Sequence, residues 1–372
     1  METLNKLKCI KSAILIVCLV LFLALFGCVM VYSASSYSAQ YHYSNQFFFL
    51  FKQIMGVVLG IAGMTFFYFF DYHKLAKLKW WIVGGAIVLL TLVFIPGIGM
   101  ESYGAKRWIS ILGFSIQPSE VAKFALVIFT ASYMSENSDK VKTLKGLLPI
   151  LAVAGTFALL IMLEPSMSVT MCLAFVTLFM LIIGGMTKKH TLMFSVPAGA
   201  AVPLLIALEP YRLKRLFAFI DPWASPQGEG FQLIQSLYSL GDGGLFGVGL
   251  FQSRQKYLFL PFAESDFILS IIGEEIGFIG TTLLLGVYFF LTYKLIKIGL
   301  NAKDRFGTML ACGIALVIAV QTLLNVAVVT GSIPPTGLPL PFISAGSTSL
   351  LVFMSAIGVV LNVDKQSRKS KI

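Results

Sequence analysis

Long apolar runs alternate with short polar segments along almost the whole 372-residue chain. Ten runs approach the length of about 20 residues that an α-helix needs to cross a bilayer. We therefore predict ten transmembrane helices. Their approximate ranges are 11–32, 47–70, 80–97, 118–135, 146–163, 167–186, 191–208, 267–295, 306–330 and 343–363.

The basic residues predict which side of the membrane each loop occupies. With the N-terminus inside, the interior segments hold 19 of the 28 Lys and Arg residues, and every interior loop is basic. Cytoplasmic loops carry this excess of positive charge. The first run follows Lys6, Lys8 and Lys11 without a small-residue cleavage site, so we interpret it as a helix and not as a cleaved signal. We expect both termini in the cytoplasm.

The longest segment between the predicted helices is 209–266, an extracellular loop between spans 7 and 8. Loops of this length are usually functional or disordered, and the many aromatic residues argue against disorder. Residues 232–250 have the pattern of a short re-entrant or interfacial helix. We find no soluble domain, so residues 1–372 are predicted to form one polytopic, all-α membrane domain.

Composition agrees with a multi-pass protein of the cytoplasmic membrane. Hydrophobic residues make up 57% of the chain and charged residues 12%, whereas soluble domains carry about 25% charged residues. The five cysteines lie in or beside apolar runs, and the three histidines lack metal-ligand spacing. The sequence predicts no nucleic-acid partner, no disulfide framework and no cofactor, and it leaves open only a divalent cation.

Seven exterior cations break the charge rule. They form three clusters, which either contact lipid headgroups or together bind an anionic ligand such as a pyrophosphate. The clusters are Lys106 and Arg107, then Arg212, Lys214 and Arg215, and finally Arg254 and Lys256.

Charged residues within the predicted spans are costly and therefore candidates for function. Glu120 and Lys123 are three residues apart, so they share a helix face and can pair, either as a structural ion pair or as a substrate contact. Glu274 and Glu275 follow Asp266 by about 12–14 Å of helix, which would put them deep in the bilayer. We expect one of the two to face a polar cavity and the other a neighbouring helix.

Asp266 lies where the long exterior loop meets the eighth predicted helix. A carboxylate there is either a helix cap, a role that Ser265 could also fill, or a general base. The last exterior segment, 331–341, contains four prolines, which exclude a regular helix. Ser344 and the hydroxyls at 347–349 follow it and either line a cavity or support helix packing.

The order of these segments resembles that of the SEDS family (shape, elongation, division and sporulation), which includes RodA-like and FtsW-like proteins. The resemblance covers nearly the whole chain and is closer to the division and sporulation branch. The matching blocks are Gly104–Trp108, Gln117–Lys123, Tyr211 and Arg212 with Arg215, Pro226–Gly230 with Gln232, Gln235 and Ser236, Gly243–Gly249, Lys256, Leu260–Phe267, Gly273–Gly277 and Thr336–Ser344.

The resemblance implies an inverting glycosyltransferase that polymerises lipid II and releases polyprenyl pyrophosphate. It implies further a class B penicillin-binding protein and other division or elongation proteins as partners. The essential aspartate of the family falls on Asp266, which makes Asp266 the predicted catalytic residue. The predicted substrate-binding residues are Lys106, Arg107, Glu120, Lys123, Arg212, Arg215, Gln235, Lys256, Glu275 and Ser344.

Three positions depart from the family pattern. Ser166 replaces the aspartate expected after Pro165, Phe262 replaces a glutamate, and Ala345 begins a block expected to read Tyr-Gly-Gly. Two other functions also fit a chain with many membrane helices, a lipid II flippase and a non-catalytic scaffold. A flippase explains less well why cations gather on the exterior face, and a scaffold would not need Asp266.

Overall fold

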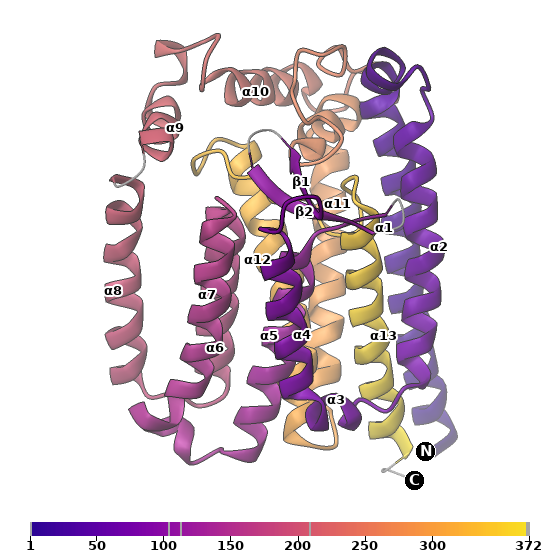
Figure 1. Ribbon diagram of the computed structural model, residues 1–372. Coiled ribbons are helices and arrows are strands. Elements are labelled where there is room, and N and C mark those ends of the chain that lie inside the picture. The colour runs from indigo at the N-terminus through magenta and orange to yellow at the C-terminus, as the bar shows by residue number, and fades with distance from the viewer. Residues whose placement is uncertain (1, 103–104, 112–113, 208–209, 370–372) are drawn as a thin grey trace.

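The computed structural model describes residues 2–102, 105–111, 114–207 and 210–369, and it is a bundle of long helices (Figure 1). All ten predicted apolar segments form helices. Among the described residues, six helices are long and apolar enough to cross a membrane, and α4 and α7 are shorter apolar helices. The ten are α1 (Glu2–Tyr43), α2 (Phe48–Phe69), α4 (Lys79–Leu92), α5 (Pro118–Glu136), α6 (Leu144–Leu163), α7 (Met167–Ile183), α8 (Lys188–Ala207), α11 (Ile268–Leu300), α12 (Arg305–Val329) and α13 (Ser347–Lys369).

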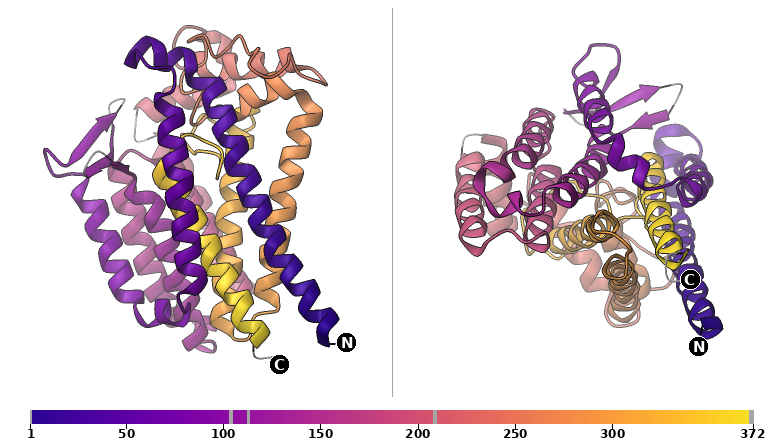
Figure 2. Two further views of the ribbon diagram at one scale, coloured as in Figure 1. Left: turned by 90° about the vertical axis from the view of Figure 1, so that its right-hand side faces the viewer. Right: turned by 90° about the horizontal axis from the view of Figure 1, so that it is seen from below.

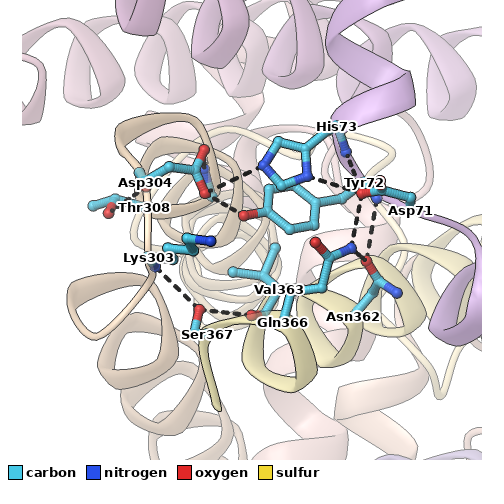
Figure 3. A network of polar contacts seen from close by, with 11 residues as sticks. Asp71, Tyr72, His73, Lys303, Asp304, Thr308, Asn362, Val363, Gln366 and Ser367 are labelled. Atoms are coloured by element: carbon cyan, nitrogen blue, oxygen red, sulfur yellow. Dashed lines mark hydrogen bonds and ion pairs between the residues drawn. The ribbon is translucent and has the colours of Figure 1, made fainter. Parts of the chain in front are cut away.

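The end of the bundle that carries both chain termini is held by a polar network (Figure 3). The backbone N–H of Tyr72, just before the short helix α3 (His73–Lys77), donates to Asn362 Oδ1 of α13 at 3.1 Å. Gln366 of α13 donates to Asp71 at 2.8 Å, and the Tyr72 hydroxyl donates to Asp304, before α12. The network joins two inter-helix connections to α13, so it fixes α13 relative to α2 and α12.

Small residues allow α13 to pack closely along α2. A side chain at Gly60 would meet Met354 of α13, since a Cβ built there lies 2.4 Å from the sulfur. Gly358 of α13 is equally close to the backbone of Met64, at 2.3 Å. Such contacts between small residues are a common way to pack helices in membranes. They position the start of α13, which carries part of the candidate site.

The prediction of an all-α fold is wrong between α4 and α5. There the chain forms an antiparallel sheet of β1 (Gly99–Ser102), β2 (Ala105–Ile111) and β3 (Phe114–Ile116), in that order. Ile109 pairs with Ile116 and is fully buried, whereas its neighbour Ser110 is exposed. This alternation is the strand period of two, but it is short and follows an apolar run. The sheet projects from the side of the bundle (Figure 2).

The long segment between α8 and α11 contains two helices and a 3₁₀ turn. It contains α9 (Pro210–Ile220), a 3₁₀ turn η2 (Pro222–Ala224) and α10 (Phe231–Gly243), which lies across the top of the bundle in Figure 1. The short helix predicted within 232–250 is thus confirmed as α10. It ends before Gly244, whose φ of 50° takes the chain out of the helix. The helix α9 was not predicted.

Helix α11 is broken at Gly277, whose φ of 71° is outside the helical region. The carbonyls of Glu274 and Glu275 accept the N–H groups of Val248 and Gly249 at 2.9 and 3.0 Å. In return, the N–H groups of Phe278 and Ile279 donate to the carbonyls of Gly244 and Leu245 at 2.9 and 3.1 Å. The glycine-rich segment 244–249 therefore satisfies the backbone groups that the break exposes.

The first part of α11, 268–276, runs toward the end of the bundle opposite the chain termini. Asn325, one turn before the end of α12, bonds to the carbonyl of Asp266 at 2.9 Å. Ser270 bonds to Ser236, which itself donates to the carbonyl of Val329, the last residue of α12. The expected deep position of Glu274 and Glu275 is therefore wrong, because the break at Gly277 reverses the chain before it crosses.

The proline-rich segment between α12 and α13 descends into the bundle and returns. Asn325 donates to the carbonyl of Leu338 at 2.7 Å, and Gln321, a turn deeper on α12, donates to that of Pro339 at 2.8 Å. The Tyr288 hydroxyl of α11 bonds to the carbonyl of Pro341. Non-helical backbone is tolerated at such depth only where protein or water satisfies it. We call 331–346 the re-entrant loop.

Candidate active site

Asp266 precedes α11 and does not cap it. The N-cap residue of α11 is Phe267, and no side chain makes a capping hydrogen bond at the start of the helix. The helix-cap interpretation of Asp266 and Ser265 is therefore wrong. The Ser265 carbonyl instead accepts a hydrogen bond from the Ser344 hydroxyl at 2.6 Å. The hydrogen bonds to the carbonyls of Ser265 and Asp266 hold the Asp266 carboxylate beside the re-entrant loop.

The surroundings of Asp266 raise its basicity. Although part of the residue remains accessible to solvent, burial raises the pKa of its carboxyl to about 6. Arg107 lowers this pKa, the neighbouring Glu264 raises it, and Arg215 lowers it. A carboxylate with a pKa of about 6 is ionised at neutral pH and still accepts a proton more readily than an ordinary aspartate.

Gly337 of the re-entrant loop lies directly against this carboxylate. A Cβ built on Gly337 would be 2.8 Å from Oδ2 of Asp266. Any side chain at position 337 would thus push against the acid. Because Gly337 has no Cβ, the loop can approach Asp266 this closely.

Backbone carbonyls orient the two arginines near Asp266. Arg107, on β2, donates through Nε to the carbonyl of Glu164 at 3.1 Å and through Nη2 to that of Pro165 at 2.6 Å. Arg215, on α9, donates to the carbonyl of Pro335 at 3.2 Å, with its Nε 3.8 Å from Glu229. Two of the three predicted cation clusters therefore contribute to one site.

Four other polar residues singled out from the sequence have no described contact with Asp266. The side chains of Lys106 and Arg212 lie outside the described residues. Lys214 is exposed on α9. Gln235, also predicted to bind substrate, is half-buried on α10, next to the fully buried Ser236.

Glu120 and Lys123 form the predicted ion pair. Lys123 Nζ is 2.8 Å from Glu120 Oε1, and both side chains are almost completely buried. Lys123 also donates to Gln321, the residue that holds the Pro339 carbonyl. Ser349, in the first turn of α13, donates to the other oxygen of Glu120 at 3.3 Å. The ion pair thus supports the re-entrant loop through Gln321.

Glu274, Glu275 and Lys256 form a second buried cluster, on the outer side of Asp266. Glu274 accepts hydrogen bonds from the Ser253 hydroxyl at 2.6 Å and the Arg254 N–H at 2.7 Å. Glu275 lies 3.5 Å from Lys256 Nζ and accepts the Ser33 hydroxyl at 2.5 Å. The expectation that one carboxylate faces a polar cavity is wrong, because both are enclosed by the loop 251–256.

Ser344 is a structural member of the site. Its hydroxyl accepts the N–H of Leu340 at 2.7 Å and donates to the Ser265 carbonyl. Gln53 of α2 donates to the carbonyls of Ile343 and Ser344 at 3.2 and 3.3 Å. These bonds tie the outgoing limb of the re-entrant loop to the segment that carries Asp266.

Sequence reasoning missed one buried acidic group, Glu164. Glu164, between α6 and α7, is 1% exposed, and neither carboxyl oxygen has a hydrogen-bond partner among the described residues. Burial raises the pKa of Glu164 to about 8, although Arg107 lowers it. The signal was a lone glutamate between two apolar runs. Gln321 and Asn325 were also missed, although two amides four apart in a predicted span share one face.

The fold and this site define a family of membrane proteins. A family model described as "Cell cycle protein", covering FtsW, RodA and SpoVE, matches residues 13–369. The chain belongs to this family, as the resemblance to the SEDS proteins implied.

Curated relatives and a solved structure match almost from end to end. Stage V sporulation protein E of Bacillus subtilis (strain 168) is 39% identical over 95% of this chain and 97% of its own. A probable peptidoglycan glycosyltransferase FtsW of Geobacter sp. (strain M18) has the same identity and coverage. A structure titled "Structural coordination of polymerization and crosslinking by a peptidoglycan synthase complex" superposes with a TM-score of 0.78 at 26% identity, over 95% of this chain and 97% of that one.

The fold also matches the crystal structure of the rod shape determining protein RodA of Thermus thermophilus. That superposition has a TM-score of 0.69 at 24% identity and covers 94% of this chain and 96% of the other.

Proposed function

We propose that the protein is a peptidoglycan glycosyltransferase that polymerises lipid II at the outer face of the bacterial cytoplasmic membrane. The observation that carries the proposal is the Asp266 carboxylate, with its raised pKa, close to Arg107 and Arg215. Relatives named as peptidoglycan glycosyltransferases match over nearly their full length. The two arginines suit an anionic leaving group, and the carboxylate suits the removal of a hydroxyl proton.

In the proposed reaction, a sugar hydroxyl of one lipid-linked molecule attacks the anomeric carbon of another. A C–O bond forms on the face opposite the pyrophosphate, the C–O bond to the pyrophosphate breaks, and the anomeric centre inverts. Asp266 takes the hydroxyl proton as attack proceeds. Arg107 and Arg215 stabilise the negative charge that develops on the departing polyprenyl pyrophosphate.

The proposed topology has ten spans with both termini in the cytoplasm. It rests on the ten apolar helices and on the basic segments at the end where Figure 1 places both chain ends. A class B penicillin-binding protein is the proposed partner. The structural relative titled as a peptidoglycan synthase complex supports a transpeptidase beside this chain.

The test is glycan synthesis by the purified protein together with a class B penicillin-binding protein of the same organism. Lipid II is supplied, and the glycan polymer is resolved on a gel. We expect polymer from the wild type and a loss of about 10²–10⁴-fold in rate from Asp266→Asn, which removes the base and changes the shape very little. Asp242→Asn, at an exposed aspartate of α10, is the matched control and should keep full activity.

The outcomes separate the candidate functions. Polymer from wild type and from folded Asp266→Asn at equal rates would retain the enzyme and remove Asp266 as its base. The absence of polymer from the wild type, with the partner bound, would favour a lipid II flippase or a scaffold. Thermal unfolding of each variant checks that the protein is folded.

A further inference from the structure

A hollow opens near the outer end of α1, away from the Asp266 carboxylate. It has a volume of about 390 Å³ and lies between the outer end of α1, the turn into α2 and the loop 251–257. About 20 residues suffice to cross a bilayer, so the end of the 42-residue α1 continues beyond the membrane core. The hollow is lined by aromatic rings, those of Tyr32, Tyr37, Phe251 and Tyr257.

The backbone under this hollow is held in a costly conformation. Phe251 has a φ of 63°, in the left-handed region that residues with a Cβ rarely adopt. Burial of the ring does not offset this cost, because the residue is 45% exposed. The buried Lys256 holds the conformation by donating to the Phe251 carbonyl at 2.5 Å. Strained residues that their surroundings fix in this way gather at ligand-binding sites.

The charges exclude an anion as the natural occupant. Lys256 is the cation of the hollow, and its Nζ is already engaged by the Phe251 carbonyl and lies 3.5 Å from the carboxylate of Glu275. The remaining polar lining is uncharged and comprises tyrosine hydroxyls, Ser36 and the exposed amides of Gln40 and Gln46. Lys256, predicted to bind substrate as a cation, therefore acts here as a support.

The rings are also arranged differently from a belt of aromatics that faces lipid. Tyr37 of α1 meets Tyr257 edge-on, with ring centroids 5.1 Å apart. Tyr32 stacks on Phe47 at 5.5 Å and meets Phe251 at 6.1 Å. Contacts between rings from three separate segments build a rigid wall. Aromatic surfaces with a few amides and hydroxyls match a neutral ligand that has both apolar faces and many hydroxyl groups.

We propose that this hollow is a subsite for the sugar rings of a glycan strand. The inference rests on the proposed function. It adds a binding site for the glycan strand to the site where the two sugars react. Glu275, beneath the hollow, follows Asp266 by nine residues along the outward part of α11, which corresponds to about 13 Å. A strand that leaves Asp266 toward the exterior therefore reaches the hollow within a few sugars.

The first test is direct binding to the intact protein in detergent. The probe is chitotetraose, a neutral β-1,4-linked tetramer of N-acetylglucosamine, and binding is measured by calorimetry. We expect saturable binding that Tyr37→Ala and Gln40→Ala each weaken about tenfold, as removal of a central contact typically does. Tyr41→Ala, at a 71% exposed tyrosine one turn along α1, is the matched control and should bind as the wild type.

Three results would overturn the subsite. They are no saturable binding by the wild type, wild-type affinity in Tyr37→Ala and Gln40→Ala, and competition by inorganic pyrophosphate. Gln40 is exposed, so its variant separates lost binding from misfolding.

The second test is the length of the glycan product. Tyr37→Ala and Gln40→Ala should consume lipid II at an unchanged initial rate while making shorter strands, because the growing strand is released sooner. Unchanged strand lengths would count against the subsite. If the wild type makes no polymer but chitotetraose binds and Tyr37→Ala weakens that binding as expected, the proposed function fails and the subsite stands.

Discussion

Two carboxyl groups near Arg107 have different protonation states at neutral pH. Glu164 is enclosed without a hydrogen-bond partner among the described residues, and burial raises its pKa to about 8. Asp266 is partly accessible and near two arginines, so burial raises its pKa only to about 6. At pH 7, Glu164 is therefore protonated and Asp266 is ionised. Of the two, only Asp266 is ready to accept a proton.

The rate of polymerisation should follow the ionisation of Asp266. Protonation removes the base, so activity is lost as the pH falls through about 6, the pKa of the folded protein. We expect the rate to fall about tenfold per pH unit below that value and to be flat between pH 7 and 8. Initial rates of lipid II consumption from pH 4.5 to 8 measure this.

The control for the pH profile is Glu164→Gln, which mimics the protonated acid. It should leave the descending limb unchanged, because Glu164 does not titrate there. A wild-type rate that stays constant down to pH 5, with the protein still folded by thermal unfolding, would contradict the assignment of Asp266 as base.

The geometry of the re-entrant loop depends on hydrogen-bond donors that belong to neighbouring helices. Proline has no N–H, and its carbonyl still requires a partner once buried. The amides of Gln321 and Asn325 on α12 and the hydroxyl of Tyr288 on α11 provide these partners. Asn325 bridges two segments of the chain, since it also donates to the Asp266 carbonyl.

Asn325→Ala should therefore damage both stability and activity. It leaves two carbonyls without their donor, at about 1–3 kcal/mol for each buried group. We expect a lower thermal midpoint in detergent and a polymerisation rate at least about tenfold lower, because Asp266 is no longer fixed.

Asn301→Ala provides the comparison for that variant. Asn301 is also an amide that bonds to a backbone carbonyl, at 2.7 Å, but it is exposed at the other end of the bundle. Its effect on the free energy of unfolding should stay within about 0.5 kcal/mol. Equal effects from the two variants would show that the bonds of Asn325 do not hold the loop.

The sequence predicted the elements better than their connections. Apolar runs identified the ten helices, and the spacing of Glu120 and Lys123 identified their ion pair. The break at Gly277 could not be predicted, because that glycine lies in an apolar run that also fits a continuous helix. The contact between Gly337 and Asp266 joins residues 71 positions apart, and no local pattern encodes it.

At the scale of the whole molecule, the functional groups gather toward the end opposite the chain termini. Arg107 is on β2 and Arg215 on α9, which lie toward that end in Figure 1, and Asp266 bonds to Asn325 near the end of α12. The tyrosine-lined hollow lies at the end of α1, whereas the polar network around Asp71 closes the other end (Figure 3). With the proposed topology, synthesis takes place outside the cell. The basic connections remain in the cytoplasm, as the charge rule requires.

Labelling of single cysteines tests this orientation. In a variant without the five native cysteines, Asp242→Cys on α10 should react with a membrane-impermeant maleimide in intact spheroplasts. Asp139→Cys, at a side chain that is 94% exposed near the opposite end, should react only after permeabilisation. Labelling in the reverse order would overturn the orientation.

The position of the re-entrant loop in the chain has a consequence for biosynthesis. The ribosome synthesises the chain from its N-terminus, so Asp266, Arg107 and Arg215 are made before α13. The loop that contacts Asp266 through Gly337 is anchored on one side by α12 and on the other by Ser344 and α13. A chain released before its last helix would carry all three reactive side chains without the surroundings that assemble them. A chain truncated before α13 is therefore expected to be inactive.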